Sequence, residues 1–196
     1  MKAKNMKPIL QVEDDPNDIF LLHHAMGKVG ADNAVHIATD GQEAIDYLRG
    51  AGKYADRREF PLPCLVLLDL NLPCMSGLEV LRWIRQESGL PLVVLVLSTS
   101  ADEGEVAAAY RLGANGYLVK PSQASKLTEM AKAIKDFWLT HNTTPKETHK
   151  ALARGGSSRS RVTPIHSQAL VPSPWSRVNS QTSSSQCHEK DHRINF

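Results

Sequence analysis

Acidic, hydroxyl and amine side chains stand at the carboxyl ends of apolar runs in this chain. Glu13 and Asp14 follow the first run, Asp69 lies near the end of the third, Ser98 ends the fourth, and Lys120 ends the fifth. In open parallel α/β sheets, ligand-binding groups gather outside the carboxyl ends of the strands. If the runs are parallel strands, these side chains meet at one rim.

The chemistry of such a meeting follows from charge. Two carboxylates about 4 Å apart repel each other by roughly 1 kcal/mol in water and about 4 kcal/mol at the intermediate dielectric of a protein surface. Lys120 supplies one counter-charge, and a divalent cation would supply the rest. Oxygen ligands favour Mg²⁺, which keeps several waters and readily accepts a phosphoryl oxygen. The pattern therefore predicts a Mg²⁺ site beside a reactive acid, Asp69.

Five short runs rich in Leu and β-branched residues are the candidate strands. They are apolar on both faces, which is typical of strands covered on both sides in a parallel sheet. The runs cover residues 8–12, 34–39, 64–70, 92–98 and 116–120.

Helical patterns separate these runs. Asp15 and Pro16 form a cap and first-turn pair, and Ser76 with Glu79 forms a capping box. Helices are expected at about 16–30, 41–50, 102–113 and 123–139, and one more opens at Ser76 and extends at least to Ile84. Strand and helix alternate five times, which predicts an α/β fold with a parallel sheet and helices on both faces. The charged link at 50–63 is expected to loop over the surface.

The amino-acid composition of the chain changes at about residue 141. Residues 1–140 carry a net charge of −3, whereas residues 141–196 carry +5 and contain ten serines. The second segment has no hydrophobic periodicity and no helix-turn-helix pattern. We expect one domain over residues 6–140 and a disordered, Ser-rich basic tail over 141–196.

Several classes of protein are disfavoured. The longest apolar stretch, at 92–97, is too short to cross a bilayer, so a soluble cytoplasmic protein is expected. Cys64, Cys74 and Cys187 form neither an even disulfide framework nor a metal-spaced cluster and are interpreted as thiols. No phosphate-binding loop of the type G-x-x-x-x-G-K-[ST] is present.

Four separated motifs carry a resemblance to a known family. "VEDD", "LLDLNLP", "LSTS" and "GANGYLVKP" resemble, in order and spacing, the receiver domain of two-component response regulators, the CheY-like family. The resemblance covers about residues 6–140 and implies a flavodoxin-like sheet of order 2-1-3-4-5. "VEDDPND" and "DGQEAIDYLRG" are similar to single-domain regulators of bacterial phytochrome-type histidine kinases.

The resemblance assigns roles to the rim. Asp69 would accept a phosphoryl group from a kinase phosphohistidine. Asp14, Asp69 and the backbone carbonyl of Asn71 would hold Mg²⁺, with Glu13 reaching it through water. Lys120 would pair with the phosphoryl oxygens, and a cis peptide bond would join it to the following proline, Pro121.

The resemblance also implies a switch. Ser98, 22 residues before Lys120, is the expected switch hydroxyl, and Thr99 is the second candidate. Tyr117 would turn inward and alter the face formed by the fourth helix, fifth strand and fifth helix. A buried tyrosine with no switch role is an equal alternative for Tyr117. Expected partners are a sensor histidine kinase or phosphotransfer protein and a second copy of the chain, with no specific DNA binding and no membrane.

Two other functions stay open from the residues alone. A haloacid-dehalogenase-type phosphatase also uses a strand-end aspartate with Mg²⁺, but it requires a second aspartate at the position of Asn71. A degenerate receiver would act as an interaction module without accepting phosphate, although here all the expected acids, the hydroxyl and the lysine are present. The prediction is a switch with at most slow self-dephosphorylation, whose lifetime Asn71 and Ser100 would set.

Overall fold

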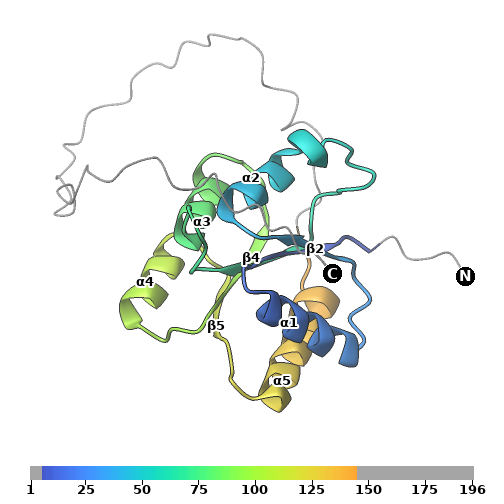
Figure 1. Ribbon diagram of the computed structural model, residues 1–196, viewed down its shortest axis with the longest axis vertical. Helices are drawn as coiled ribbons and strands as arrows, with labels where there is room; N and C mark the ends of the chain where they lie inside the picture. The colour runs from blue at the N-terminus through green and yellow to red at the C-terminus, as the bar shows by residue number, and fades with distance from the viewer. Residues whose placement is uncertain (1–5, 145–196) are drawn as a thin grey trace, which may run out of the picture. The chain divides into compact units, whose positions relative to one another are not determined.

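The computed structural model describes residues 6–144 and contains a five-stranded parallel sheet (Figure 1). The strands are β1 (Ile9–Val12), β2 (Val35–Ala38), β3 (Leu65–Asp69), β4 (Val93–Ser98) and β5 (Gly116–Val119). They lie in the order β2-β1-β3-β4-β5, and every neighbouring pair is parallel. The predicted strands, their direction and their order are confirmed.

Five α-helices cover the two faces of this sheet. They are α1 (Pro16–Lys28), α2 (Gly41–Arg49), α3 (Gly77–Gln86), α4 (Glu103–Arg111) and α5 (Ala124–Ile134), with a short 3₁₀ helix at Gly52–Tyr54 and a π-helical continuation of α5 at Lys135–His141. In Figure 1, α1 and α5 lie side by side on one face, and α2, α3 and α4 cover the other. Both faces are therefore covered, as the apolar runs predict.

The helices begin at the predicted caps. The side chain of Asp15 accepts a hydrogen bond from the backbone N–H of Asn17, at 2.7 Å, and Pro16 takes the first helical position. Ser76 and Glu79 form the complete capping box at the start of α3. These interactions satisfy N–H groups that have no partner inside the helix, so they fix where each helix starts.

The core lies in two layers, one on each face of the sheet. All residues of β1, β3 and β4 are buried, whereas the edge strands β2 and β5 are only partly buried. Leu10, Val66 and Val94 face α2 and α3, and Ile9, Leu67 and Leu95 face α1 and α5. The three central strands thus form a rigid platform whose carboxyl ends carry the candidate site.

The link between α2 and β3 is more tightly packed than predicted. Tyr54 is only 5% exposed, and its ring lies 5.1 Å from that of Tyr47 and 5.0 Å from that of Phe60. Arg57 donates to the backbone carbonyls of Tyr47, Leu48 and Phe60. The aromatic side chains bury apolar surface and so hold the link against the domain. The charged residues of the link had instead favoured a surface loop.

Glu43 anchors this link to α2, and we expect its loss to destabilise the protein. Its carboxylate accepts from Lys53 and Tyr54 at 2.7 Å each and from the Thr39 amide at 2.7 Å. Burial alone would raise its pKa, but these hydrogen bonds lower the pKa to about 2. Because the folded-state pKa lies below the unfolded value, the stabilisation is complete above about pH 4.5 and disappears as the pH falls toward 2.

The Glu43→Gln variant should therefore lose about 2 kcal/mol of unfolding free energy at pH 7 and very little at pH 2. Urea unfolding measured at several pH values tests this. An equal loss at all pH values would contradict the role of the Glu43 charge. Glu87→Gln, an exposed carboxylate at the end of α3, is the control.

Three further predictions concern the membrane, the cysteines and the tail. Among the described residues, no helix is long and apolar enough to span a membrane.

Cys64 is a free thiol, but Cys74 is disulfide-bonded, so the expectation of a thiol at Cys74 is wrong. An odd number of cysteines excludes a framework in which every cysteine is paired, but it does not exclude one disulfide bond. Cys187 and the predicted tail from residue 145 onward lie outside the described residues.

Candidate functional site

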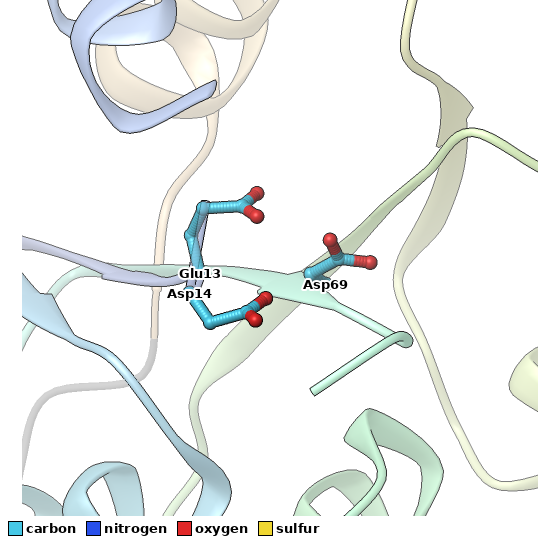
Figure 2. A group of neighbouring side chains, drawn as sticks. All are labelled: Glu13, Asp14 and Asp69. Atoms are coloured by element: carbon cyan, nitrogen blue, oxygen red, sulfur yellow. The ribbon is translucent and has the colours of Figure 1, made fainter. Parts of the chain in front are cut away.

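Three carboxylates converge at the carboxyl ends of β1 and β3. Glu13 and Asp14 directly follow β1, and Asp69 is the last residue of β3, which pairs with β1 (Figure 2). One carboxylate oxygen from each residue lies within 4.8 Å of those from the other two. Glu13 and Asp69 are buried, whereas Asp14 is exposed. The acidic cluster predicted from the sequence is therefore present, although Asp69 lies more than fifty positions from Glu13 and Asp14 in the chain.

Lys120 binds this cluster from the end of β5. Its Nζ atom lies 2.5 Å from Glu13 Oε2 and 2.7 Å from Asp69 Oδ2, and its side chain is only 12% exposed. A third partner, Asp18 Oδ2 at 2.8 Å, comes from the first turn of α1. Asp18 was not predicted. The signal available was its place in the first turn of the helix that directly follows Glu13 and Asp14.

The cluster carries more negative than positive charge. One ammonium contacts Glu13, Asp18 and Asp69, and Asp14 adds a fourth carboxylate beside them. Burial raises the pKa of Glu13 to about 7, although its hydrogen bond to Lys120 acts in the opposite direction. For Lys120, burial would lower the pKa, but hydrogen bonds to Asp18, Asp69 and Glu13 outweigh it and raise the pKa. The ammonium is thus held charged.

The backbone around Asp69 fixes the direction of its carboxylate. Asp69 Oδ1 accepts a hydrogen bond from the Asn71 amide at 3.0 Å. Gly77, the first residue of α3, packs so closely that an added Cβ would lie 2.0 Å from the Asp69 carbonyl oxygen. Only glycine permits that approach, so the start of α3 lies against the end of β3. The predicted metal contact of the Asn71 carbonyl stays a prediction, and the Asn71 side chain is exposed.

Ser98 and Tyr117 are linked through the loop after β4. Ser98 is fully buried, lies one position beyond the register partner of Asp69, and accepts a hydrogen bond at Oγ from the Ser100 amide, at 3.1 Å. The Tyr117 hydroxyl donates to the Ser100 carbonyl at 3.0 Å. Ser100 therefore contacts both predicted switch residues, one through its N–H and one through its C=O. Thr99, the second candidate hydroxyl, is exposed.

One expectation about Lys120 is wrong. The described residues contain no cis peptide bond, so the bond between Lys120 and Pro121 is trans. The trans form is the more stable isomer even before proline. In it the Lys120 amide donates to the Ser98 carbonyl at 2.8 Å while its side chain reaches three carboxylates, so the site assembles without the cis isomer.

The donor set fits a divalent cation. Carboxylate oxygens are the ligands that hard cations prefer, and the local excess of negative charge favours one. Glu13, Asp14 and Asp69 are the residues that would hold it. Lys120 contacts the Oδ2 atom of the buried Asp69, and Asp14 is the exposed member of the three acids.

Fold and site together define a receiver domain, and comparison with known proteins agrees. Residues 9–132 match the family model described as the response regulator receiver domain. The chain belongs to this family.

Relatives extend this result. Response regulator Rcp1 of Synechocystis is 39% identical over 140 residues, which cover 71% of this chain and 93% of Rcp1. The structure of the phosphorylated cyanobacterial phytochrome response regulator RcpA is 39% identical with a TM-score of 0.67 and covers 72% of this chain and 99% of RcpA. The Mn²⁺-bound form of Rcp1 gives a TM-score of 0.65 at 39% identity and covers 71% of this chain and 99% of the other.

These findings confirm the predicted class. The chain carries a receiver domain of the two-component type and is similar to regulators of phytochrome signalling. A metal-bound relative and the acidic cluster agree on a divalent-cation site in this family. The phosphatase and the degenerate module, which the residues alone left open, are not favoured.

Divalent cations should stabilise this protein through the cluster. We expect Mg²⁺ or Mn²⁺ at 100 times its dissociation constant to add about 2.7 kcal/mol to the unfolding free energy. Asp14→Asn should raise the stability of the metal-free protein, because a like charge is removed, and should abolish most of the metal effect. Denaturant unfolding with and without the cation measures both. Asp32→Asn, which removes an exposed acid outside the cluster, should keep the full metal effect.

Proposed function

We propose that this protein accepts a phosphoryl group on Asp69 from a histidine kinase or phosphotransfer protein and thereby switches a protein-interaction face. One observation supports this most strongly: the buried Asp69 carboxylate lies both in a three-carboxylate cluster and 2.7 Å from the ammonium of Lys120. A nucleophilic acid, a cation site and a fixed positive charge are thus adjacent. This is the set that a phosphoryl transfer to carboxylate needs.

The transfer can be written for these residues. An oxygen of the Asp69 carboxylate attacks phosphorus while the bond from phosphorus to the donor's imidazole nitrogen breaks. The electron pair of that bond leaves with the imidazole, which departs neutral because its other ring nitrogen carries a proton, and an acyl phosphate forms on Asp69. The hydrogen bond from the Asn71 amide orients the attacking carboxylate. A bound cation would neutralise charge on the phosphoryl oxygens, and we propose Mg²⁺ held by Glu13, Asp14, Asp69 and the Asn71 carbonyl.

Lys120 then has two successive partners. Before transfer its ammonium contacts Asp69 Oδ2, and after transfer it pairs with a phosphoryl oxygen, which carries more charge than one carboxylate oxygen. Ser98 supplies a hydroxyl from the neighbouring strand, which can donate to a second phosphoryl oxygen.

The switch follows from the Ser100 contacts. When Ser98 moves toward the phosphoryl group, it carries the Ser100 amide with it, and the carbonyl of Ser100 is the acceptor for Tyr117. Tyr117 is half-buried beside Ala109 of α4, so its movement alters the surface of α4 and β5. Tyr110 and Val119 on that surface are 53% and 46% exposed. They are apolar side chains available to a partner or a second copy of the chain.

The remaining parts of the proposal concern the setting. The partner is a kinase of the phytochrome type, in line with the similarity to RcpA, and the exchange takes place in the cytoplasm. A receiver domain over residues 6–140 with a disordered tail stays a prediction. The protein acts as a switch and not as a turnover enzyme.

Intact-mass measurement tests this function. Incubation with acetyl phosphate and Mg²⁺ should add one phosphoryl group per chain, and chelation of the cation should prevent it. A phosphomonoester should not be hydrolysed with rapid multiple turnover. Rapid turnover would favour a phosphatase, and the absence of any adduct would favour a degenerate receiver.

A further inference from the structure

A small cavity lies between α1 and α5, behind the Lys120 cluster. It has a volume of about 40 Å³. Its polar end is formed by Glu13, Asp18 and Lys120, and its apolar wall includes Leu22 and Met130. The cavity lies on the same face of the sheet as α1 and α5 and shares Glu13 with the acidic cluster, whereas Asp14 and Asp69 do not line it.

Gln11 gives this cavity an unexplained polar group. It lies in the middle of β1, is only 2% exposed, and lines the cavity beside Glu13. Its side-chain Nε2 has no hydrogen-bond partner among the described residues. A buried amide donor without a partner is unfavourable, and native proteins pair nearly all such groups. The other residues of β1 are Ile, Leu and Val. The one buried amide in this strand therefore indicates a bound ligand that pairs with it.

The size of the cavity decides which ligand fits. One water molecule needs about 10–15 Å³, whereas a cavity known to bind benzene has a volume of about 150 Å³. About 40 Å³ therefore suits a few waters and excludes most organic molecules. Apolar cavities stay dry, but this one offers an amide donor and two carboxylates, enough polar partners for bound water.

We propose that this cavity binds a cluster of on the order of three ordered waters, held by Gln11, Glu13 and Asp18, which replace Lys120 when it turns toward a phosphorylated Asp69. The second half rests on the proposed function. In the unphosphorylated protein Lys120 is the charged partner of Glu13 and Asp18. The side chain of Glu13 is only 3% exposed, so losing that ammonium without a substitute would leave a buried carboxylate with only its hydrogen bond from the Asp15 amide.

Gln11 is accordingly a positioning residue. It holds water in reach of the two carboxylates and does not touch the reacting atoms. Replacing its amide by a side chain of equal length that cannot donate should leave the waters with fewer partners. The shift of Lys120, and with it phosphorylation, should then become slower.

Two measurements on the full chain test the proposal, with Gln11→Met as the variant. Gln42→Met, at an exposed position of α2, is the matched control. First, magnetisation transfer from water to side-chain amide protons is recorded by NMR on the unphosphorylated wild-type protein. We expect contacts with long-lived water at the Gln11 Nε2 protons, whose signal is absent from Gln11→Met and present in Gln42→Met.

Second, the rate of phosphorylation by acetyl phosphate with Mg²⁺ is compared. Gln11→Met should be slower by about fivefold, the size expected for the loss of one hydrogen bond between uncharged groups, with an unchanged half-saturating Mg²⁺ concentration. Gln42→Met should match the wild type.

The outcomes separate the two ideas. Absence of long-lived water at the Gln11 amide overturns the water site, whatever the phosphorylation result. Long-lived water together with an unchanged phosphorylation rate in Gln11→Met overturns its role in the Lys120 shift. A wild-type protein that takes no phosphoryl group overturns the proposed function, but the water measurement still stands because it uses the unphosphorylated protein.

Discussion

The Asp69→Asn variant is expected to take up no phosphoryl group from acetyl phosphate under conditions that phosphorylate the wild-type protein fully. An amide is a far weaker nucleophile than a carboxylate, and the variant also removes one of the three cluster acids. The physical reason is local, because Asp69 lies between Lys120 and the neighbouring acids. Intact-mass measurement over time gives the extent of modification.

Folding of the variant should be preserved. Asparagine has the size of aspartate, and its side-chain oxygen can still accept from the Asn71 amide. Removing one of several like charges should even raise the thermal midpoint of the metal-free protein. Asp46→Asn, on α2 and outside the cluster, serves as the matched control and should be phosphorylated normally. An adduct that persists in Asp69→Asn would show that another residue accepts the group.

The Lys120→Met variant should lose both stability and phosphorylation. Lys120 is the ammonium that contacts Glu13, Asp18 and Asp69, and Met keeps the length of the side chain but not its charge. Removing one partner of a buried ion pair costs roughly 3–5 kcal/mol, and the partial exposure of Asp18 places the expected loss at about 3 kcal/mol. Urea unfolding without divalent cation measures it.

Mg²⁺ should affect the stability and the phosphorylation of Lys120→Met differently. Mg²⁺ neutralises some of the same carboxylates, so it should restore more stability to Lys120→Met than it adds to the wild type. It should not restore the phosphorylation rate, because the ammonium that would pair with the phosphoryl group is still missing. Lys126→Met, an exposed lysine of α5, should behave like the wild type in both assays. A variant with unchanged stability would contradict the central place of Lys120 in the cluster.

The fold was predictable because local patterns agree with the tertiary structure. The runs at 64–70 and 92–98 are apolar except for Asp69 and Ser98, and the structure buries every residue of the strands they form, β3 and β4. The capping box at Ser76 is a contact within one turn, so it forms wherever the sequence occurs. The rim was predictable for a related reason: the carboxyl ends of parallel strands lie along one edge of the sheet.

Other features depend on contacts that sequence patterns do not encode. Asp18 looks like an ordinary first-turn acid until the structure places Lys120 beside it. In the sequence Gly77 is only a glycine beside the capping box, but the close approach of the Asp69 backbone is what requires it. Gln11 is one polar residue in a hydrophobic strand, and only the cavity beside it gives it significance. Each of these three roles becomes visible only when the distances between elements remote in sequence are known.

The central claim is that Asp69 itself carries the phosphoryl group. Borohydride reduces an aspartyl phosphate to homoserine, so treatment with acetyl phosphate and Mg²⁺, then borohydride, then peptide mass mapping locates the modified residue directly. We expect homoserine at position 69 and at no other aspartate. An unmodified Asp69, or homoserine at another position, would contradict it.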